Sequence, residues 1–216
     1  MSNSPNPSSD RLFKLFSRQL PILQAFRFAD TDRDHINRLL CWADFPPNSN
    51  VVDLGSGSGF VAAHMCDFRP DLSFCLVDSS QVQLDLADLR FRKHCSDICD
   101  VPEPDNQFNA LICSYAIGYV DADCFFREAA RLVQPGGIAF IVDMVPASQD
   151  LEHQFVFGYK VRSRSVLENS AKAASLTMDF YMEPIDNSGW GESLFSGSFN
   201  IFFGKVKPAI WRFRVP

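Results

Sequence analysis

The chain of 216 residues contains no long uninterrupted apolar run, although 46% of its residues are hydrophobic. A membrane-spanning helix needs about 20 consecutive, mostly apolar residues, and no stretch of this sequence approaches that length. Residues 1–10 are rich in Ser, Asn and Pro and lack the apolar core of a signal peptide. We therefore expect a cytoplasmic protein without a membrane span.

An excess of positive charge is also missing. The 20 Lys and Arg residues stand against 26 Asp and Glu residues, which leaves a formal net charge of −6. Such a balance provides no long-range attraction to a phosphate backbone. We therefore expect no nucleic-acid partner.

Cysteines at short paired spacings are absent as well. The seven cysteines are odd in number and scattered, mostly within apolar runs, which is typical of reduced thiols in a protein core. His94, Cys95 and Cys99 come nearest to a metal-binding group, but a structural zinc site uses four ligands with paired short spacings. We therefore expect neither a disulfide framework nor a metal site.

What the sequence does contain, from Asn50 onward, is an alternation of apolar runs and helical patterns. Strands are expected at 51–54, 72–77, 108–113 and 138–142, and helices at 61–68 and 124–132. This alternation is typical of βαβ units around a parallel sheet. It predicts an α/β fold with a Rossmann-like open sheet, mostly parallel, and helices on both faces.

The N-terminal part, residues 1–49, is expected to be a flexible segment followed by a helical cap. Apolar residues at helical spacing predict a helix near 12–20 and a second one ending before Pro46-Pro47. Residues 50–216 are expected to form a single domain that ends in aromatic strands.

Beyond Pro146 the pattern is less regular. Helices are expected at 151–159 and 165–176, and a strand at 177–182. Turn signals at 187–189 and near Lys207-Pro208, within an aromatic tail, predict a terminal antiparallel strand or hairpin. The basic run of Lys160, Arg162 and Arg164 is expected to be a solvated positive edge, with an anionic group of a substrate as the alternative ligand.

A glycine loop follows the strand at 51–54. Gly55, Gly57 and Gly59 allow a sharp turn and let a ligand lie against bare backbone, in the crevice where open α/β sheets bind ligands. The dinucleotide fingerprint G-x-G-x-x-G requires a small residue where this chain has Phe60, so a nicotinamide cofactor is disfavoured.

Two acidic residues accompany this loop. Asp53 stands two residues before the first glycine, where it would repel a pyrophosphate but could bind a positively charged group. Asp78 ends the next strand, where a carboxylate can accept both hydroxyls of a ribose.

The loop, together with Asp53 and Asp78, resembles the class I S-adenosylmethionine-dependent methyltransferases, and the resemblance extends from about residue 50 to residue 143. Three further segments match in order: Ser96-Asp97-Ile98 looks like the Gly-Asp segment, Phe108 to Ser114 like the fourth strand, and Leu132 to Gly137 like the Leu-(Lys/Arg)-Pro-Gly-Gly turn. The resemblance implies S-adenosylmethionine as cofactor and S-adenosylhomocysteine as product. Ser96, Asn109 and Gln134 depart from the family's usual residues.

The resemblance also implies site residues. The cofactor contacts expected from it are Asp53, Gly55, Ser56, Gly57, Gly59, Asp78, Ser79, Asp97, Ile98 and Ser114. Asp78 would hold the ribose and Asp97 the adenine amine. Tyr115, Tyr119 and His153 are expected to line the substrate pocket. No catalytic residue is assigned, because methyl transfer is an in-line displacement in which a general base is optional.

The expected activity is methyl transfer to a small molecule. Residues 114–117 lack the Pro-Pro-Tyr type of segment with which amine-methylating nucleic-acid enzymes stack a base, and no Pro-Cys nucleophile pair for cytosine occurs. The alternative is a non-catalytic subunit that keeps the fold and acts through a protein partner. The sequence does not reveal the acceptor atom, the substrate or the oligomeric state, because this fold serves many functions.

Overall fold

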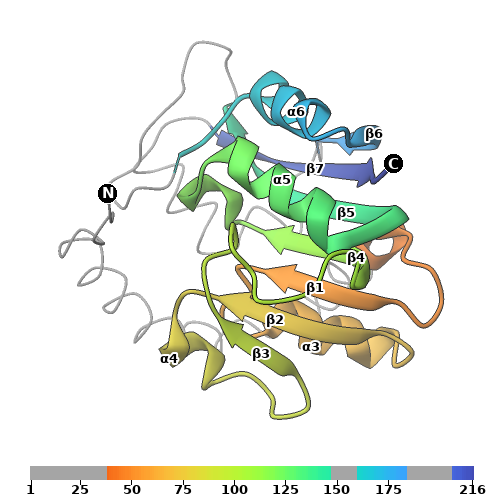
Figure 1. Cartoon of the computed structure of the whole chain (residues 1–216), viewed down its shortest axis with the longest axis vertical. Helices are drawn as coiled ribbons and strands as arrows, with labels where there is room; N and C mark the ends of the chain where they lie inside the picture. The colour runs from red at the N-terminus through yellow and green to blue at the C-terminus, as the bar shows by residue number, and fades with distance from the viewer. Residues whose placement is uncertain (1–37, 147–159, 184–205) are drawn as a thin grey trace.

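The computed structural model describes residues 38–146, 160–183 and 206–216, which are coloured in Figure 1. The helices expected at 12–20 and 151–159, the turn expected at 187–189 and the candidate residue His153 lie outside the described residues.

A seven-stranded sheet in the order β3-β2-β1-β4-β5-β7-β6 forms the centre of the fold. The strands are β1 (Asn50–Leu54), β2 (Ser73–Asp78), β3 (Arg92–Cys95), β4 (Phe108–Ser114), β5 (Val133–Pro146), β6 (Thr177–Met182) and β7 (Val206–Arg214). Strands β1 to β5 pair in parallel, and β7 pairs antiparallel with both β5 and β6. In Figure 1, β7 points opposite to β1 and β4. The predicted sheet, mostly parallel with a terminal antiparallel strand, is confirmed.

Helices cover both faces of this sheet. They are α3 (Phe60–Phe68), the short α4 (Gln81–Leu84), α5 (Ala122–Leu132), α6 (Arg164–Ala173), the 3-10 turn η1 (Ile117–Tyr119) and a helical stretch at 38–43. Figure 1 shows α5 and α6 on one face and α3 on the other. No helix among the described residues combines the length and apolar character that a membrane crossing requires.

Strand β4 shows why its sequence reads as one continuous apolar run. Leu111 and Cys113 belong to the apolar cluster under α5 and α6, whereas Ala110 and Ile112 belong to the cluster under α3. A strand of a parallel sheet is covered on both faces, so the central positions 110–113 are all buried and the alternation of polar and apolar residues is lost there.

The turn residues Pro135-Gly136-Gly137 predict a turn between α5 and the next strand. The structure does not have a turn there. The segment lies within β5, where the pairing with β4 skips from Phe108↔Val133 to Ala110↔Ile138. The extra residues form a bulge, with Gly136 at φ +79°. Proline and glycine are tolerated inside a strand at such a bulge.

Lys207-Pro208 is not a turn either, because it lies inside β7, where Pro208 is aligned with Met144 of β5. The other neighbour, β6, pairs with β7 only from Ile210 onward. The backbone at Pro208 therefore has a ladder partner on one side only, which is a position where a strand accepts proline.

The topology makes the edge at the carboxyl ends of the parallel strands the candidate position for a ligand. Because β1 to β5 are parallel, their carboxyl ends meet at the same edge, and the chain order reverses between β1 and β4. Open α/β sheets bind their ligands at this kind of switch point.

Candidate functional site

The loop after β1 folds back over the end of β2. The backbone N–H groups of Gly55 and Ser56 both donate to the Val77 carbonyl, at 2.8 and 3.1 Å. Gly55 has a φ of +76°, and a Cβ built on it would lie 2.1 Å from Cβ of Ala116. The first glycine is therefore required by its conformation and by the chain that packs against it.

Asp78, at the end of β2, fastens this loop. Its Oδ2 accepts the Gly57 N–H and its Oδ1 accepts the Ser80 N–H, both at 2.8 Å. Burial raises the pKa of this carboxyl group, and the two backbone bonds oppose the rise. A carboxylate is therefore held at the strand end with its position fixed by two backbone donors.

Asp53 is a second buried carboxyl group, with 2% of its surface exposed. Burial, and to a lesser extent the charge of Asp78, raises the pKa of Asp53 to about 7. Two acids thus lie at the ends of adjacent strands, and a ligand with positive charge would relieve the cost of ionising both.

Replacing Asp53 by Asn should flatten the dependence of stability on pH in the cofactor-free protein. The folded pKa is about 7 against an ordinary value of 3.8, so between these values the folded chain retains a proton that the unfolded chain releases. Stability therefore falls as pH rises through this range. We expect Asp53→Asn to gain up to about 4 kcal/mol over the wild type at pH 8 and much less at pH 5.

Urea unfolding at the two pH values measures this difference in the free energy of unfolding. Asp100→Asn, at an exposed position in the connection between β3 and β4, is the matched control and should leave the wild-type slope unchanged. A loss of stability in Asp53→Asn at pH 8 would contradict the assignment, because it would make the ionised carboxylate favourable.

Unpartnered polar atoms gather at the same edge of the sheet. Among the residues that the structure describes, five buried side-chain polar atoms have no hydrogen-bond partner: Ser56 Oγ, Gln83 Oε1, Ser96 Oγ, Ser114 Oγ and Trp211 Nε1. The first four belong to the segments at the carboxyl ends of β1 to β4. Because a buried polar group without a partner is costly, a row of four suggests that a ligand satisfies them.

The turn after β4 carries two of the predicted substrate-pocket residues. Tyr115 adopts a φ of +56°, which is unusual for a residue with a side chain, and its N–H donates to the Val142 carbonyl at 2.8 Å. Tyr119 follows in η1 with 51% of its surface exposed. Strained backbone of this kind is common at functional sites.

Arg162 holds this turn in place. The basic run predicts that it belongs to a solvated edge, but it is buried. It is 7% exposed, and its guanidinium donates to the carbonyls of Ile117, at 2.9 Å, and Val120. The Ile117 carbonyl also accepts the Val120 N–H at 3.3 Å, so the guanidinium gives it a second donor and binds the Val120 carbonyl directly after η1, which explains why an arginine is buried there.

The other predicted residues divide between the edge and the core. Asp97 is exposed, and its carboxylate accepts the Cys99 N–H at 2.9 Å, while Ile98 is buried. Ser79 is exposed beside Asp78. Gly59 is needed for packing, because a Cβ there would lie 2.6 Å from Leu76 Cδ1.

Gln83 lies beside the glycine loop but is not among the site residues predicted from the sequence. It is 5% exposed, and its Oε1 lies 4.0 Å from the position of a Cβ built on Gly57. The signal in the sequence is the short polar helix that begins three residues after the acid at the end of β2.

Asn109, which departs from the residue usual in the family, has a structural role, since its Oδ1 accepts the Asn50 N–H at 2.8 Å.

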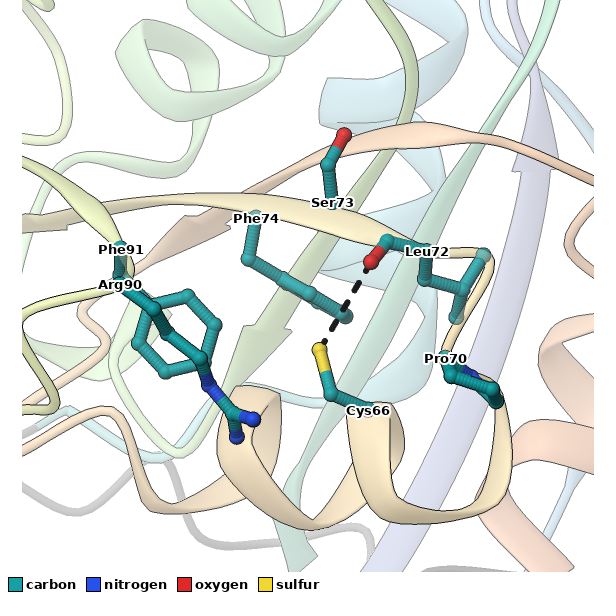
Figure 2. Close-up of a pocket in the computed structure, with 7 residues that line it drawn as sticks. All are labelled: Cys66, Pro70, Leu72, Ser73, Phe74, Arg90 and Phe91. Carbon is teal, nitrogen blue, oxygen red and sulfur yellow. Dashed lines mark hydrogen bonds between the residues drawn. The ribbon is translucent and has the colours of Figure 1, made fainter.

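Two shallow hollows lie away from this edge. The one in Figure 2, about 260 Å³, is formed at the beginning of β2 by seven residues: Cys66, Pro70, Leu72, Ser73, Phe74, Arg90 and Phe91. The other, about 330 Å³, lies between the 38–43 helix and Phe68-Arg69. Neither contains the paired acids or the unpartnered polar atoms, so the candidate site is the carboxyl edge.

Residues 52–141 match the methyltransferase domain family. Over 192 residues the chain is 26% identical to the ubiquinone/menaquinone biosynthesis C-methyltransferase UbiE of Desulfotalea psychrophila, covering 82% of this chain and 78% of that protein.

Two solved structures share the fold at low sequence identity. The cyclase SpnF superimposes with a TM-score of 0.76 at 16% identity, covering 96% of both chains. The geranyl diphosphate C-methyltransferase from Streptomyces coelicolor, solved with S-adenosyl-L-homocysteine, gives 0.71 at 16% identity over 85% of this chain and 77% of that one. At this identity the likeness shows the fold.

Proposed function

Because this chain is a member of the class I S-adenosylmethionine-dependent methyltransferases, we propose that it transfers the methyl group of its cofactor to a small molecule. The observation that carries the proposal is the row of four unpartnered polar atoms beside two buried carboxyl groups. The name of the relative from Desulfotalea psychrophila, a C-methyltransferase of ubiquinone and menaquinone biosynthesis, supports a small-molecule acceptor.

The residues at the edge fit S-adenosylmethionine, which carries a sulfonium, an amino group, ribose hydroxyls and an adenine amine. Asp53 and Asp78 supply negative charge, and the unpartnered serine hydroxyls and Gln83 carbonyl supply hydrogen-bonding groups. A Cβ built on Gly57 would meet nothing closer than 4.0 Å. A ligand can therefore lie directly against the backbone of that glycine.

We assign the parts of the cofactor to residues accordingly. Asp78 would accept the ribose hydroxyls, because each carboxylate oxygen can accept a further bond besides the one from Gly57 or Ser80. The loop at 55–57 and Asp53 would receive the charged amino-acid end, and Asp97 the adenine amine.

Methyl transfer requires mainly that the protein align the acceptor with the methyl group of the cofactor. The bound cofactor supplies an electrophilic methyl group on a positively charged sulfur. The chain holds the reacting partners in line and excludes water, for which no covalent bond to a side chain is needed. The buried acids Asp53 and Asp78 act on the affinity for the cofactor, by favouring a positively charged ligand at the edge.

The test is transfer of a labelled methyl group. The purified protein is incubated with S-adenosylmethionine carrying a deuterated methyl and a panel of small phenols, quinols and carboxylic acids, and the products are identified by mass spectrometry. We expect one labelled methyl group on at least one acceptor of the panel. Labelling confined to protein or nucleic acid when a cell extract replaces the panel would overturn the small-molecule assignment.

Tyr119 is expected to contact the acceptor. The residue is half exposed on η1, and its pKa is raised first by the burial of its other part and then by the charges of Asp143 and Asp78. An aromatic contact of about 1.5 kcal/mol corresponds to roughly tenfold in affinity. Tyr119→Ala should therefore raise the KM for the acceptor about tenfold.

Steady-state kinetics and calorimetry separate this role from a structural one. The affinity for S-adenosylhomocysteine should stay unchanged in Tyr119→Ala, and Tyr119→Phe should keep most of the acceptor affinity, because the ring remains. An equal loss of cofactor and acceptor binding would show that the substitution disturbs the turn as a whole.

A further inference from the structure

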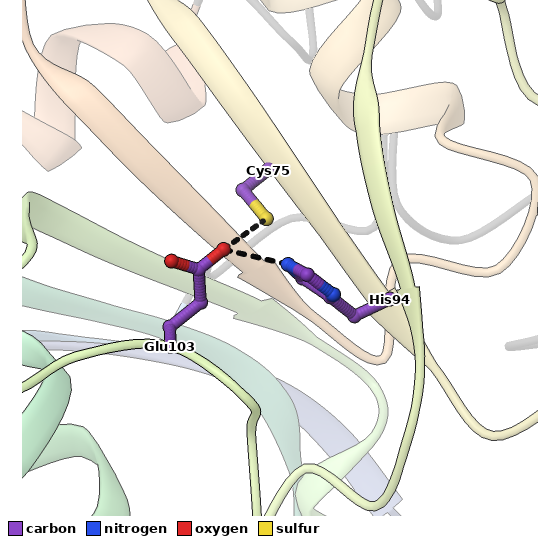
Figure 3. Close-up of side chains that lie close together, drawn as sticks. All are labelled: Cys75, His94 and Glu103. Carbon is purple, nitrogen blue, oxygen red and sulfur yellow. Dashed lines mark hydrogen bonds and ion pairs between the residues drawn. The ribbon is translucent and has the colours of Figure 1, made fainter.

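We propose that Cys75, His94 and Glu103 form a binding site for a divalent transition-metal ion of the zinc type. The three side chains point toward one another from β2, β3 and the connection between β3 and β4 (Figure 3). Their ligand atoms all lie within 4.8 Å of one another. Thiolate, imidazole and carboxylate are the three side-chain ligands that zinc uses in proteins.

The sheet register brings the first two ligands to the same face. Cys75 is aligned with Arg92, and Val77 with His94, in the parallel pair of β2 and β3. Cys75 and Val77 both belong to the apolar cluster under α5, so His94 faces the same side of the sheet. Residues separated by 19 positions in the sequence thus become neighbours.

The third ligand is held over that face by a separate network. The backbone carbonyl of Glu103 accepts a bond from Arg131 Nη1 at 2.7 Å, and Arg131 Nη2 donates to the Val101 carbonyl at 2.9 Å. The Val101 N–H in turn donates to Glu128 Oε1 at 2.8 Å. The connection is therefore fixed to α5, and the Glu103 side chain is 5% exposed.

The distances approach those of a metal site. Zinc bonds of 2.0–2.3 Å place tetrahedral ligand atoms roughly 3.3–3.8 Å apart. Glu103 Oε1 already lies 3.8 Å from Cys75 Sγ, whereas its 2.6 Å distance to His94 Nε2 is that of a hydrogen bond. Binding requires the carboxylate to turn so that its oxygen moves away from the imidazole by about 1 Å.

Metal binding would balance by release of a proton. The metal–sulfur bond forms as the Cys75 thiol gives its proton to solvent, the metal–nitrogen bond forms at His94 Nε2 in the neutral tautomer that carries its proton on Nδ1, and the oxidation state of every atom is unchanged. A water molecule would complete the fourth position. The His94 side chain is 25% exposed and provides the route of entry, and the bound ion would join β2 to β3 directly before Ser96.

Arg92 is the competitor for the same carboxylate. Its Nη2 lies 3.1 Å from Glu103 Oε1, and its side chain is 47% exposed. A guanidinium at this distance repels a cation, but its exposure lets it move into solvent. Removing its charge should therefore strengthen metal binding.

This site differs from the group of His94, Cys95 and Cys99 that comes nearest to a metal site by sequence spacing. Cys95, directly after His94, is exposed, and its Sγ donates to the Ser79 carbonyl at 3.6 Å. It is not part of the cluster among the described residues. Cys95→Ser is therefore a matched control, because it removes a thiol beside His94 without removing a proposed ligand.

The experiment is titration of the full-length, reduced protein with Zn²⁺ in competition with a chromophoric chelator, and with Co²⁺ followed by absorption. We expect one equivalent of metal and, with Co²⁺, a sulfur-to-metal charge-transfer band that Cys75→Ser abolishes. His94→Gln and Glu103→Gln should each weaken Zn²⁺ binding at least tenfold. Arg92→Gln should tighten it severalfold, and Cys95→Ser should leave it unchanged.

The opposite pattern would overturn the proposal. Binding that survives both His94→Gln and Glu103→Gln, or that Cys95→Ser abolishes, would assign the metal to other thiols. Absence of a stoichiometric complex in both the wild type and Arg92→Gln would equally refute the site. Near-ultraviolet circular dichroism identifies any variant that fails to fold, and in that case the remaining two ligand variants decide.

Discussion

Asp78→Ala should weaken the binding of S-adenosylmethionine and S-adenosylhomocysteine about 100-fold. The substitution removes the proposed ribose acceptor and also the two bonds that hold the backbone at Gly57 and Ser80. Hydrogen bonds to a charged group contribute about 1.5–3 kcal/mol each, so the loss of two at the ligand corresponds to at least about 3 kcal/mol. Isothermal titration calorimetry measures both dissociation constants directly.

Asp78→Asn sharpens this test. An amide has the size of the carboxylate, but its NH2 group would face one of the two backbone donors, so it cannot accept from both Gly57 and Ser80. We expect it to lose most of the affinity as well. Asp85→Asn, at an exposed position directly after α4, should bind normally, and unchanged constants in Asp78→Ala would exclude Asp78 from the cofactor site.

The second large effect is expected from Gly55→Ala, which should lower the free energy of unfolding by about 4 kcal/mol. The new Cβ would lie 2.1 Å from Cβ of Ala116, at a φ of +76°. Neither backbone can move freely, since Gly55 is tied to Val77 and Ala116 is 8% exposed. For a chain of this size the thermal midpoint should fall by about 10 °C.

Gly136→Ala separates the effect of the contact from that of the dihedral angle. Gly136 has a similar φ of +79°, but a Cβ there would meet nothing within 4 Å. We expect only the cost of the left-handed conformation, about 1 kcal/mol. Adding Ala116→Gly to Gly55→Ala should restore part of the lost stability, and equal losses in the two alanine variants would disprove the close contact.

The central part of the fold was predictable because its local signals agree with one another. The strand at 51–54, the glycine loop, the helix at 61–68 and the strand ending at Asp78 all occur within about one residue of their predicted bounds. In these segments the apolar runs are long and the turn residues are unambiguous, so local preference and tertiary packing lead to the same result.

The strand β3 was not predictable in this way. Its four residues, Arg92 to Cys95, are polar or partly exposed because the strand lies at the edge of the sheet. An edge strand needs little apolar surface and often carries charge, which removes the usual signal. The neighbours that β3 brings to His94 were therefore also hidden, since Cys75 and Glu103 join it only through sheet register and a connecting loop.

The site itself was predictable only in part. Ser114 follows from the family resemblance and has an unpartnered hydroxyl at the edge, whereas the burial of Arg162 depends on two carbonyls of a turn that no sequence pattern marks. Long-range contacts of this kind are set by the packing of whole elements. Sequence patterns therefore predict the residues of the glycine loop better than the residues, such as Arg162, that hold the neighbouring turn in place.

The order in which the strands join the sheet has a consequence for synthesis of the protein. Among the described strands, β7 comes after all the others in the chain but lies between β5 and β6, so β6 pairs with no other described strand until β7 inserts. The parallel strands can assemble before residues 206–214 have left the ribosome, with the edge of β5 exposed during that interval. A nascent chain that stalls before residue 206 would present this edge to other chains, so the nine-residue strand β7 protects β5 against misassembly by covering its edge.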